Sequence, residues 1–226
     1  MKIGLLIAVS RELEAFLQSG EELAEETVAG NTVYKAVMEG HEIYAVCSGC
    51  GEIDAAAATM LLIVRYGCSL VMNFGVAGAL DKDLKVEDLF AVEKVWHYDF
   101  DITPFGNGIR TGQYEGFADE FIPLDAGLAR LTAAQVPGIR VVAAASGDKF
   151  VEDRQEKLRL RASGCSICEM ELAAIALVCS RCGVKCLSIK CISDTFDGGC
   201  GDFNTNVQKS AEKAFTALRA VLRALR

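Results

Sequence analysis

Continuous apolar runs recur along the chain and alternate with segments of helical periodicity. A run without polar alternation is typical of a strand that is buried on both faces of a sheet. The sequence predicts such strands at residues 2–9, 69–80, 139–146 and 184–194. Helices are predicted at 11–19, 52–67, 124–134, 154–161, 172–182 and 205–225. This alternation indicates one α/β domain over residues 1–226. We expect a three-layer αβα arrangement in which the central sheet is mixed and largely parallel.

Turns and irregular segments complete the expected chain path. Residues 32–49 predict a hairpin that turns at Gly40 and His41, so His41 is expected to be exposed. Ser10 is expected to cap the first helix. The apolar run 69–80 is expected to pass into a glycine turn at residues 75–78, and residues 87–98 predict another strand. Residues 99–123 predict a long irregular segment, and a loop of that length is usually functional or disordered.

Composition and charge narrow the classes of function. The chain has 226 residues, of which 51% are hydrophobic, enough for one domain with a large core. The net charge is −8 and the basic residues are scattered, which argues against a nucleic-acid partner. The longest apolar stretch, residues 55–64, is too short to cross a bilayer, and the N-terminus does not read as a signal peptide. We therefore expect a cytoplasmic protein that has no membrane partner.

Ten cysteines raise the question of metal binding. Three pairs have the C-x-x-C spacing: Cys47/Cys50, Cys165/Cys168 and Cys179/Cys182. Structural zinc sites use two such pairs close together in space, usually on tight turns. Cys179 instead falls within an apolar helical pattern, and no pairing with histidine is evident. We expect the thiols to be small core residues, with no metal site and no disulfide.

Carboxylates at the ends of predicted strands are the candidates for chemistry, because ligands of α/β folds gather there. Asp194 ends the strand 184–194, Glu12 follows the first strand, and Glu171 stands at the start of a helix. Burial at a strand end would raise the pKa of Asp194 and suit it to act as a general acid. Each of these acids has a simpler explanation in capping a helix or turn. The Gly49-x-Gly51 pair lacks the remaining features of a dinucleotide loop, so no cofactor is expected.

Six stretches, in this order, resemble the nucleoside phosphorylase/nucleosidase superfamily over essentially the whole chain. They are KIGLLIAVSRELEAF, NFGVAGAL, YDFDITPFG, SGDKFV, CEMELAAIA and IKCISD. The pattern is most similar to the bacterial 5′-methylthioadenosine/S-adenosylhomocysteine nucleosidases. The resemblance implies a nucleoside phosphorylase-like fold and hydrolysis of the N-ribosidic bond of a purine nucleoside, with release of adenine. It also implies a cytoplasmic homodimer that acts in methionine salvage.

The resemblance assigns catalytic roles by position. Asp194 matches the acid that protonates the purine at N7, and Glu12 matches the residue that positions and deprotonates the attacking water. Glu171 matches the carboxylate that binds the ribose hydroxyls. Glu169, two residues earlier, is expected to be only a helix-start acid.

Substrate contacts are implied in the same way. Met170 matches the residue that packs against the sugar, Phe150 the aromatic that stacks on the base, and Val151 the backbone group that reads the base edge. Ile102 and Phe105 match residues that a dimer partner inserts over the 5′ substituent.

Two positions depart from the family pattern. Val76 stands where the family usually has a hydroxyl side chain, and Lys190 stands where it usually has arginine. Lysine cannot copy the bidentate geometry of a guanidinium group. The exact nucleoside therefore stays open. A futalosine-type or other nucleoside hydrolase is one alternative, and a nucleoside-binding protein with weak turnover is another.

A phosphate-dependent phosphorylase is a further alternative. Asn73 stands where related hexameric phosphorylases carry a phosphate-binding arginine, and Val76 lacks the hydroxyl. Arg11 and Lys190 could in principle replace these ligands. The Glu12 carboxylate would repel phosphate and could take a proton from water, so water is the expected nucleophile.

Overall fold

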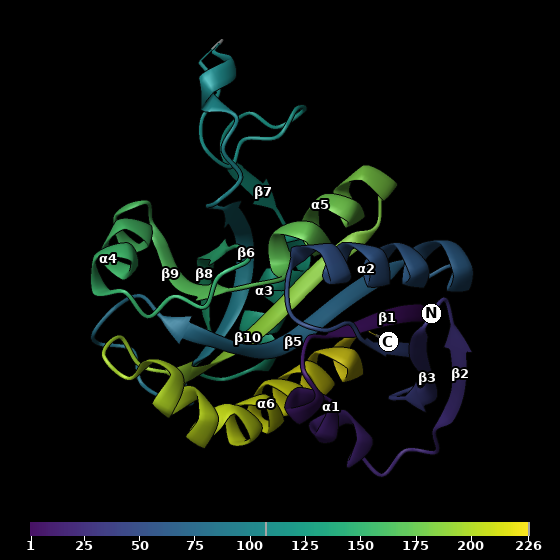
Figure 1. Cartoon of the computed structure of the whole chain (residues 1–226). Coiled ribbons are helices and arrows are strands. Elements are labelled where there is room, and N and C mark those ends of the chain that lie inside the picture. The colour runs from purple at the N-terminus through teal and green to yellow at the C-terminus, as the bar shows by residue number, and fades with distance from the viewer. Residues whose placement is uncertain (107, 226) are drawn as a thin grey trace.

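The computed structural model describes residues 1–106 and 108–225. Its strands are β1 (Lys2–Ile7), β2 (Ala24–Val28), β3 (Asn31–Met38), β4 (His41–Cys47), β5 (Leu70–Ala79), β6 (Leu89–His97), β7 (Phe121–Pro123), β8 (Arg140–Ser146), β9 (Cys165–Glu169) and β10 (Lys185–Asp194). Its helices are α1 (Ser10–Leu17), α2 (Glu52–Tyr66), η1 (Thr103–Phe105), α3 (Ala126–Gln135), α4 (Arg154–Ala162), α5 (Leu172–Cys182) and α6 (Gly199–Ala224) (Figure 1).

The strands form one mixed sheet that closes on itself at one end. Strand β5 pairs with both β9 and β10, while β6 and β8 join those two strands, so five strands form a ring. From β5 the sheet continues through β1 and β4 to the hairpin strands β3 and β2. The pairings of β1 with β4 and β5, and of β5 with β10, are parallel. The ends of β1, β5 and β10 therefore meet at one edge.

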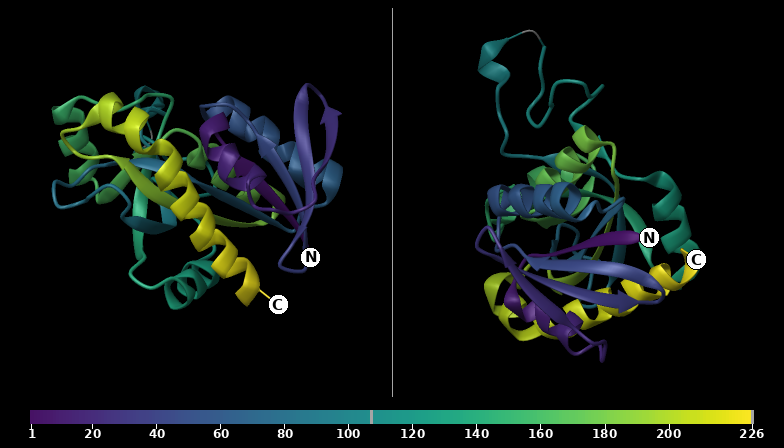
Figure 2. Two further views of the ribbon diagram at one scale, coloured as in Figure 1. Left: turned by 90° about the horizontal axis from the view of Figure 1, so that it is seen from below. Right: turned by 90° about the vertical axis from the view of Figure 1, so that its right-hand side faces the viewer.

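Helices cover both faces of the sheet, as the apolar runs predicted. Helices α2 and α5 lie on one face and α1 and α6 on the other (Figures 1 and 2). Alternate residues of β1 enter different halves of the core: Leu5 and Ile7 pack on the side of Phe215 from α6, and Leu6 packs on the side of Leu62 from α2. A strand with both faces covered gives its side chains no access to water, which explains the uninterrupted hydrophobicity of β1.

The expected α/β class with a mixed sheet and flanking helices is confirmed, and several local expectations are wrong. Strands β2, β7 and β9 were not predicted. Strand β2 has no buried residue, and β7 is only three residues long, so neither carries a strong hydrophobic signal. Helix α6 begins six residues earlier than position 205.

The glycine-rich segment 75–78 also differs from the expectation, because it lies inside β5 and is not a turn. The first helix begins at Ser10, and its N-cap is Val9. His41 starts β4, because the hairpin turn falls on Glu39 and Gly40, both of which have positive φ, and His41 is buried. The His41 imidazole lies against the carbonyl of Leu222, with 3.1 Å between Nε2 and the oxygen.

Between β6 and β7, the chain forms an arm that projects from the body of the molecule (Figures 1 and 2). At its base, the rings of Phe100 and Tyr114 stack with centroids 4.3 Å apart, and Tyr114 hydrogen-bonds His97 Nδ1 at 2.6 Å. Among the described residues of the segment 99–123, η1 and β7 alone are regular, so the expectation of an irregular segment is largely confirmed. Within the described part of the chain, none of the helices is both long enough and apolar enough to cross a membrane.

Candidate active site

A cavity of about 320 Å³ opens where β1, β5 and β10 end. This is the edge at which α/β folds collect ligands. Seven of the predicted site residues line it: Glu12, Val76, Phe150, Val151, Met170, Glu171 and Asp194. The fold therefore brings together side chains that are as far apart in sequence as Glu12 and Asp194.

The Glu12 carboxylate is buried and held by backbone N–H groups. Val76 N–H donates to Oε1 at 2.8 Å, and Ala8 and Val9 N–H donate to Oε2 at 3.2 Å. Burial raises the pKa of Glu12, and the ammonium of Lys190 and these hydrogen bonds oppose the rise. A buried carboxylate with a raised pKa is a better proton acceptor than an exposed one.

A glycine makes room for the Glu12 carboxylate. A Cβ on Gly75 would lie 2.4 Å from Glu12 Oε1, closer than atoms can approach. The backbone of β5 therefore comes within contact distance of the acid only because residue 75 has no side chain.

Asp194 is a buried acid that faces the same cavity. Burial raises its pKa, while the Ser193 hydroxyl, which donates to Oδ1 at 2.8 Å, opposes the rise. Asp194 is not required as a cap for the turn that follows it. Another acid, Asp202, fills that role, because it accepts the backbone N–H of Thr195 at 3.1 Å. A Cβ on Gly78 would lie 2.8 Å from Asp194 Oδ2, so a second glycine of β5 leaves room for this acid.

Glu171 and Glu169 have different roles at the start of α5. Glu171 Oε1 accepts the N–H of Gly51 at 3.0 Å, and burial together with Glu169 raises the pKa of Glu171 to about 7. Glu169 accepts the N–H groups of Glu171 and Leu172, so it is a helix-start acid as expected. It also forms an ion pair with Lys190, which the sequence did not indicate.

Lys190 is buried beside Glu169 and is not among the residues that line the cavity. Its Nζ is 3.1 Å from Glu169 Oε2, and both side chains are 2% exposed. The sequence placed Lys190 in a substrate pocket by analogy with an arginine. The structure instead makes it the buried cation that faces Glu12, Glu169 and Glu171.

An aromatic pair lies at the mouth of the cavity. Phe150 is 38% exposed, and its ring meets Phe203 edge-on with centroids 5.6 Å apart. Phe203, which α6 contributes, was not predicted as a site residue. A lone aromatic residue in the polar stretch GDFNTN was the available signal. The guanidinium of Arg11 lies over the Phe203 ring at 5.5 Å.

Two predicted site residues lie away from the cavity. Ile102 and Phe105 belong to the projecting arm, and Phe105 is 80% exposed. Within one chain they do not meet the other predicted residues.

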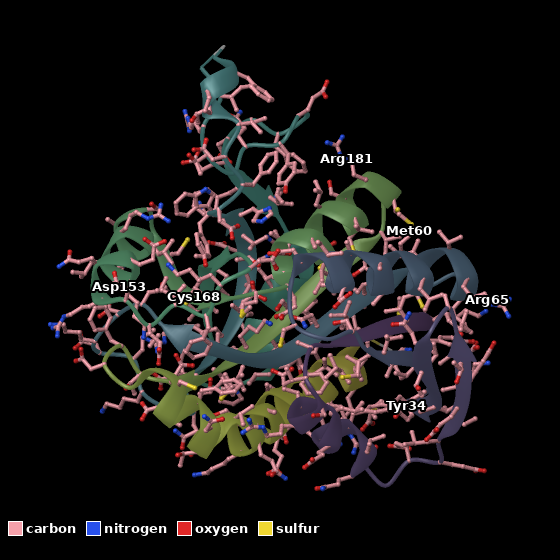
Figure 3. The ribbon with its side chains drawn as sticks, in the orientation of Figure 1. Tyr34, Met60, Arg65, Asp153, Cys168 and Arg181 are labelled. Atoms are coloured by element: carbon pink, nitrogen blue, oxygen red, sulfur yellow. The ribbon has the colours of Figure 1, made fainter. Side chains whose placement is uncertain are left out.

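The ten cysteines are free thiols. Cys50 and Cys168 line the cavity, and Cys168, labelled in Figure 3, donates to the carbonyl of Gly78 at 3.7 Å. Within residues 1–106 and 108–225, no group of three or more histidine, cysteine, aspartate or glutamate side chains could hold a metal ion.

A family model described as "Phosphorylase superfamily" matches residues 2–225. The chain belongs to the phosphorylase superfamily. It is 31% identical to the 5′-methylthioadenosine/S-adenosylhomocysteine nucleosidase of Shewanella halifaxensis, with 100% of both chains covered. It is 32% identical to the aminodeoxyfutalosine nucleosidase of Campylobacter jejuni, with 86% of both covered.

A solved structure shows the same fold. It is the 5′-methylthioadenosine/S-adenosylhomocysteine nucleosidase of S. pneumoniae with a transition-state inhibitor, MT-ImmA. Its TM-score to this chain is 0.91 at 26% identity, and 100% of each chain is covered. The resemblance read from the six sequence stretches is thus confirmed.

Proposed function

We infer that this chain, acting as a single domain, hydrolyses the N-ribosidic bond of a purine nucleoside. The observation that carries the inference is that Asp194, Glu12 and Glu171, three buried carboxyl groups, line one cavity. Cleavage of this bond builds positive charge on the sugar and negative charge on the base. Carboxylates beside the sugar stabilise its positive charge, and an acid at the base neutralises the negative charge by giving it a proton.

Each acid then has one task. Burial raises the pKa of Asp194, which favours the protonated form, and Asp194 gives its proton to N7 of the base, which leaves as a neutral molecule. Glu12 takes a proton from the attacking water, and the three N–H groups that hold it fix its direction. Glu171 accepts hydrogen bonds from the ribose hydroxyls, Met170 packs against the sugar, and Phe150 and Val151 hold the base.

Water, rather than phosphate, is the nucleophile. The backbone N–H of Val76 donates to Glu12, and Asn73 donates its amide to a β1 carbonyl at 3.1 Å. Arg11 and Lys190, the two cations that could replace the missing phosphate ligands, already contact other side chains. Arg11 hydrogen-bonds the side chain of Asn204 at 3.0 Å, and Lys190 is paired with Glu169. A phosphate dianion would meet the Glu12 carboxylate, whose neighbouring cation Lys190 is already paired with Glu169.

The names of the relatives favour two substrate classes. We propose 5′-methylthioadenosine or S-adenosylhomocysteine first, which would place the chain in methionine salvage in the cytoplasm, and aminodeoxyfutalosine second. Chromatography measures the release of adenine from each of these nucleosides and from adenosine, and of hypoxanthine from inosine, with and without phosphate. Phosphate should leave the rates unchanged, and turnover that requires phosphate and yields ribose 1-phosphate would contradict the proposal.

The substitution Asp194→Asn tests the role of the acid. Asparagine keeps the shape but has no proton of comparable acidity to transfer, so kcat should fall by roughly 10²–10⁴-fold with the melting temperature little changed. Asp197→Asn is the matched control, because that carboxylate lies three residues further on and is 65% exposed. Near-normal kcat in Asp194→Asn would remove this residue from the mechanism.

We also propose that two copies of the chain form a homodimer. Ile53, Met60 and Val64 lie on one face of α2 and are 80%, 42% and 73% exposed; Met60 is labelled in Figure 3. An exposed apolar stripe of this kind favours burial against another surface. In the dimer, the arm would bring Phe105, and with it Ile102, over the neighbouring cavity.

Mixing two inactive variants tests this exchange. A Phe105→Ala subunit retains Asp194, and an Asp194→Asn subunit retains Phe105. If the arm completes the neighbouring site, refolding the two together should restore about a quarter of wild-type activity, because half of the dimers have one intact site of two. Absence of any recovery, or a fully active monomer in sedimentation, would contradict the proposal.

A further inference from the structure

Glu171 occupies the N-cap position of α5, yet its carboxylate does not cap that helix. An N-cap side chain normally accepts the N–H of the second or third helical residue, which here are Ala173 and Ala174. Other side chains take both of these groups. Ser146 Oγ accepts Ala173 N–H at 3.1 Å, and Glu52 Oε2 accepts Ala174 N–H at 2.6 Å.

The earlier N–H groups of α5 are satisfied as well. Glu169 accepts those of Glu171 and Leu172, at 3.1 and 3.0 Å to Oε2. Every N–H from Glu171 to Ala174 therefore has a partner, and the Glu171 carboxylate supplies none of them. This frees Glu171 to line the cavity.

Reciprocal hydrogen bonds connect the starts of α2 and α5. Gly51, the N-cap of α2, donates its N–H to Glu171 Oε1 at 3.0 Å. Glu52, the first residue of α2, accepts Ala174 N–H from α5. Each helix thus provides the acid that caps the other, and the contact sets where both acids can point.

We propose that Glu52 is a positioning residue that keeps the Glu171 carboxylate directed at the ribose hydroxyls. The proposal rests on the function proposed above, because it names what holds the sugar-binding acid. Without Glu52, Ala174 N–H would lose its partner inside the protein, and a buried unpaired N–H is unfavourable. Glu171 is the N-cap residue, whose side chain normally accepts this N–H, so it would turn back to cap its own helix and leave the cavity.

Glutamine is a close mimic of Glu52. Burial and the neighbouring Glu169 carboxylate raise the pKa of Glu52 to about 9, so the acid carries a proton at neutral pH. Oε2 of the acid accepts Ala174 N–H at 2.6 Å, and Oε1 accepts the Ser146 hydroxyl at 2.5 Å. In glutamine, the amide oxygen can accept Ala174 N–H and the amide nitrogen can donate to Ser146 Oγ, so both partners are kept.

The test compares Glu52→Ala, Glu52→Asp and Glu52→Gln in the full chain. Asp54→Ala is the matched control, because it removes an exposed acid from the same first turn of α2. Calorimetry measures the affinity for adenine and for formycin A, an adenine nucleoside analogue whose carbon–carbon bond cannot be hydrolysed. KM and kcat are measured with the best nucleoside substrate, and the melting temperature reports folding.

The expected result is a loss of affinity that affects only ligands carrying the sugar. Glu52→Ala and Glu52→Asp should weaken formycin A binding and raise KM by about 10-fold or more, as loss of a charge-assisted hydrogen bond does. The adenine affinity and the Asp54→Ala control should stay within about twofold of wild type. Glu52→Gln should restore the formycin A affinity. A merely structural defect would instead lower the fraction of folded protein, and with it the apparent kcat, without changing KM.

Different outcomes separate this inference from the proposed function. Wild-type protein that binds formycin A but hydrolyses no nucleoside would contradict the proposed function, and the binding of the variants would still test Glu52. Unchanged formycin A affinity in Glu52→Ala, or equal losses for adenine and formycin A, would overturn the inference. If Glu52→Ala does not fold, the same readings in Glu52→Asp decide.

Discussion

Replacing Lys190 with methionine removes a buried cation from a cluster of carboxylates. The ammonium lies 3.1 Å from Glu169 Oε2. It also opposes the rise in the pKa of Glu12 and of Glu171, both of which burial raises. Methionine is similar in length and fills most of the space, so the variant tests the charge rather than the packing.

The expected loss of stability is large. Removing one member of a buried ion pair costs about 3–5 kcal/mol, because the other charge stays buried without a partner. A whole domain is stable by only about 5–15 kcal/mol. The loss of Lys190 also raises the pKa of the nearby acids. At pH values above that pKa, each unit of this rise adds about 1.4 kcal/mol to the loss of stability.

The loss should depend on pH. Glu12 and Glu171 have folded-state pKa values above those of the unfolded chain, so they destabilise the fold increasingly as pH rises above the unfolded value. Without Lys190 these pKa values rise further. The difference in the free energy of unfolding between wild type and Lys190→Met should therefore be small near pH 5 and largest above about pH 8.

Urea unfolding at both pH values, followed by circular dichroism at one protein concentration, measures this difference. Lys185→Met is the control, because Lys185 lies on the same strand, is 64% exposed and is 3.6 Å from Asp125. Its loss should stay below about 1 kcal/mol. A Lys190→Met loss as small as that of the control at pH 8 would refute the reasoning, and an equal loss at both pH values would refute its electrostatic origin.

Two further predictions concern the cavity. Gly75→Ala should lower kcat by about 10²-fold or more, because the added methyl displaces the Glu12 carboxylate. The affinity for adenine, measured by calorimetry, should stay at the wild-type value, and an unchanged kcat would contradict the role of Glu12. Burial and Glu169 raise the pKa of Glu171 to about 7, so kcat/KM should fall as pH drops below 7, because the protonated acid is a weaker acceptor for ribose hydroxyls. A pH–rate profile in which Glu171→Gln keeps this acid limb would show that another group is responsible.

The strands and helices of the core could be predicted because their signal is local. The run 2–9 and the helix 52–67 each carry their burial pattern in consecutive residues, and the observed β1 and α2 begin where predicted and end at Ile7 and Tyr66. Strand β2 has no such pattern, since none of its residues is buried. His41 was misplaced for a related reason: its burial comes from α6, which follows some 180 residues later.

The sequence alone identified Asp194, Glu12 and Glu171, because a strand-end acid and the order of the six family stretches are visible in one dimension. Only the tertiary structure decided how these acids are held. The hydrogen bond from Val76 N–H to Glu12 arises where the register of β5 beside β1 places residues 75 and 76 against the carboxylate. The pairing of Lys190 with Glu169 depends on how β9 and β10 flank β5. Such contacts join residues that are distant in the chain, so their energies depend on strand pairing and not on any local pattern.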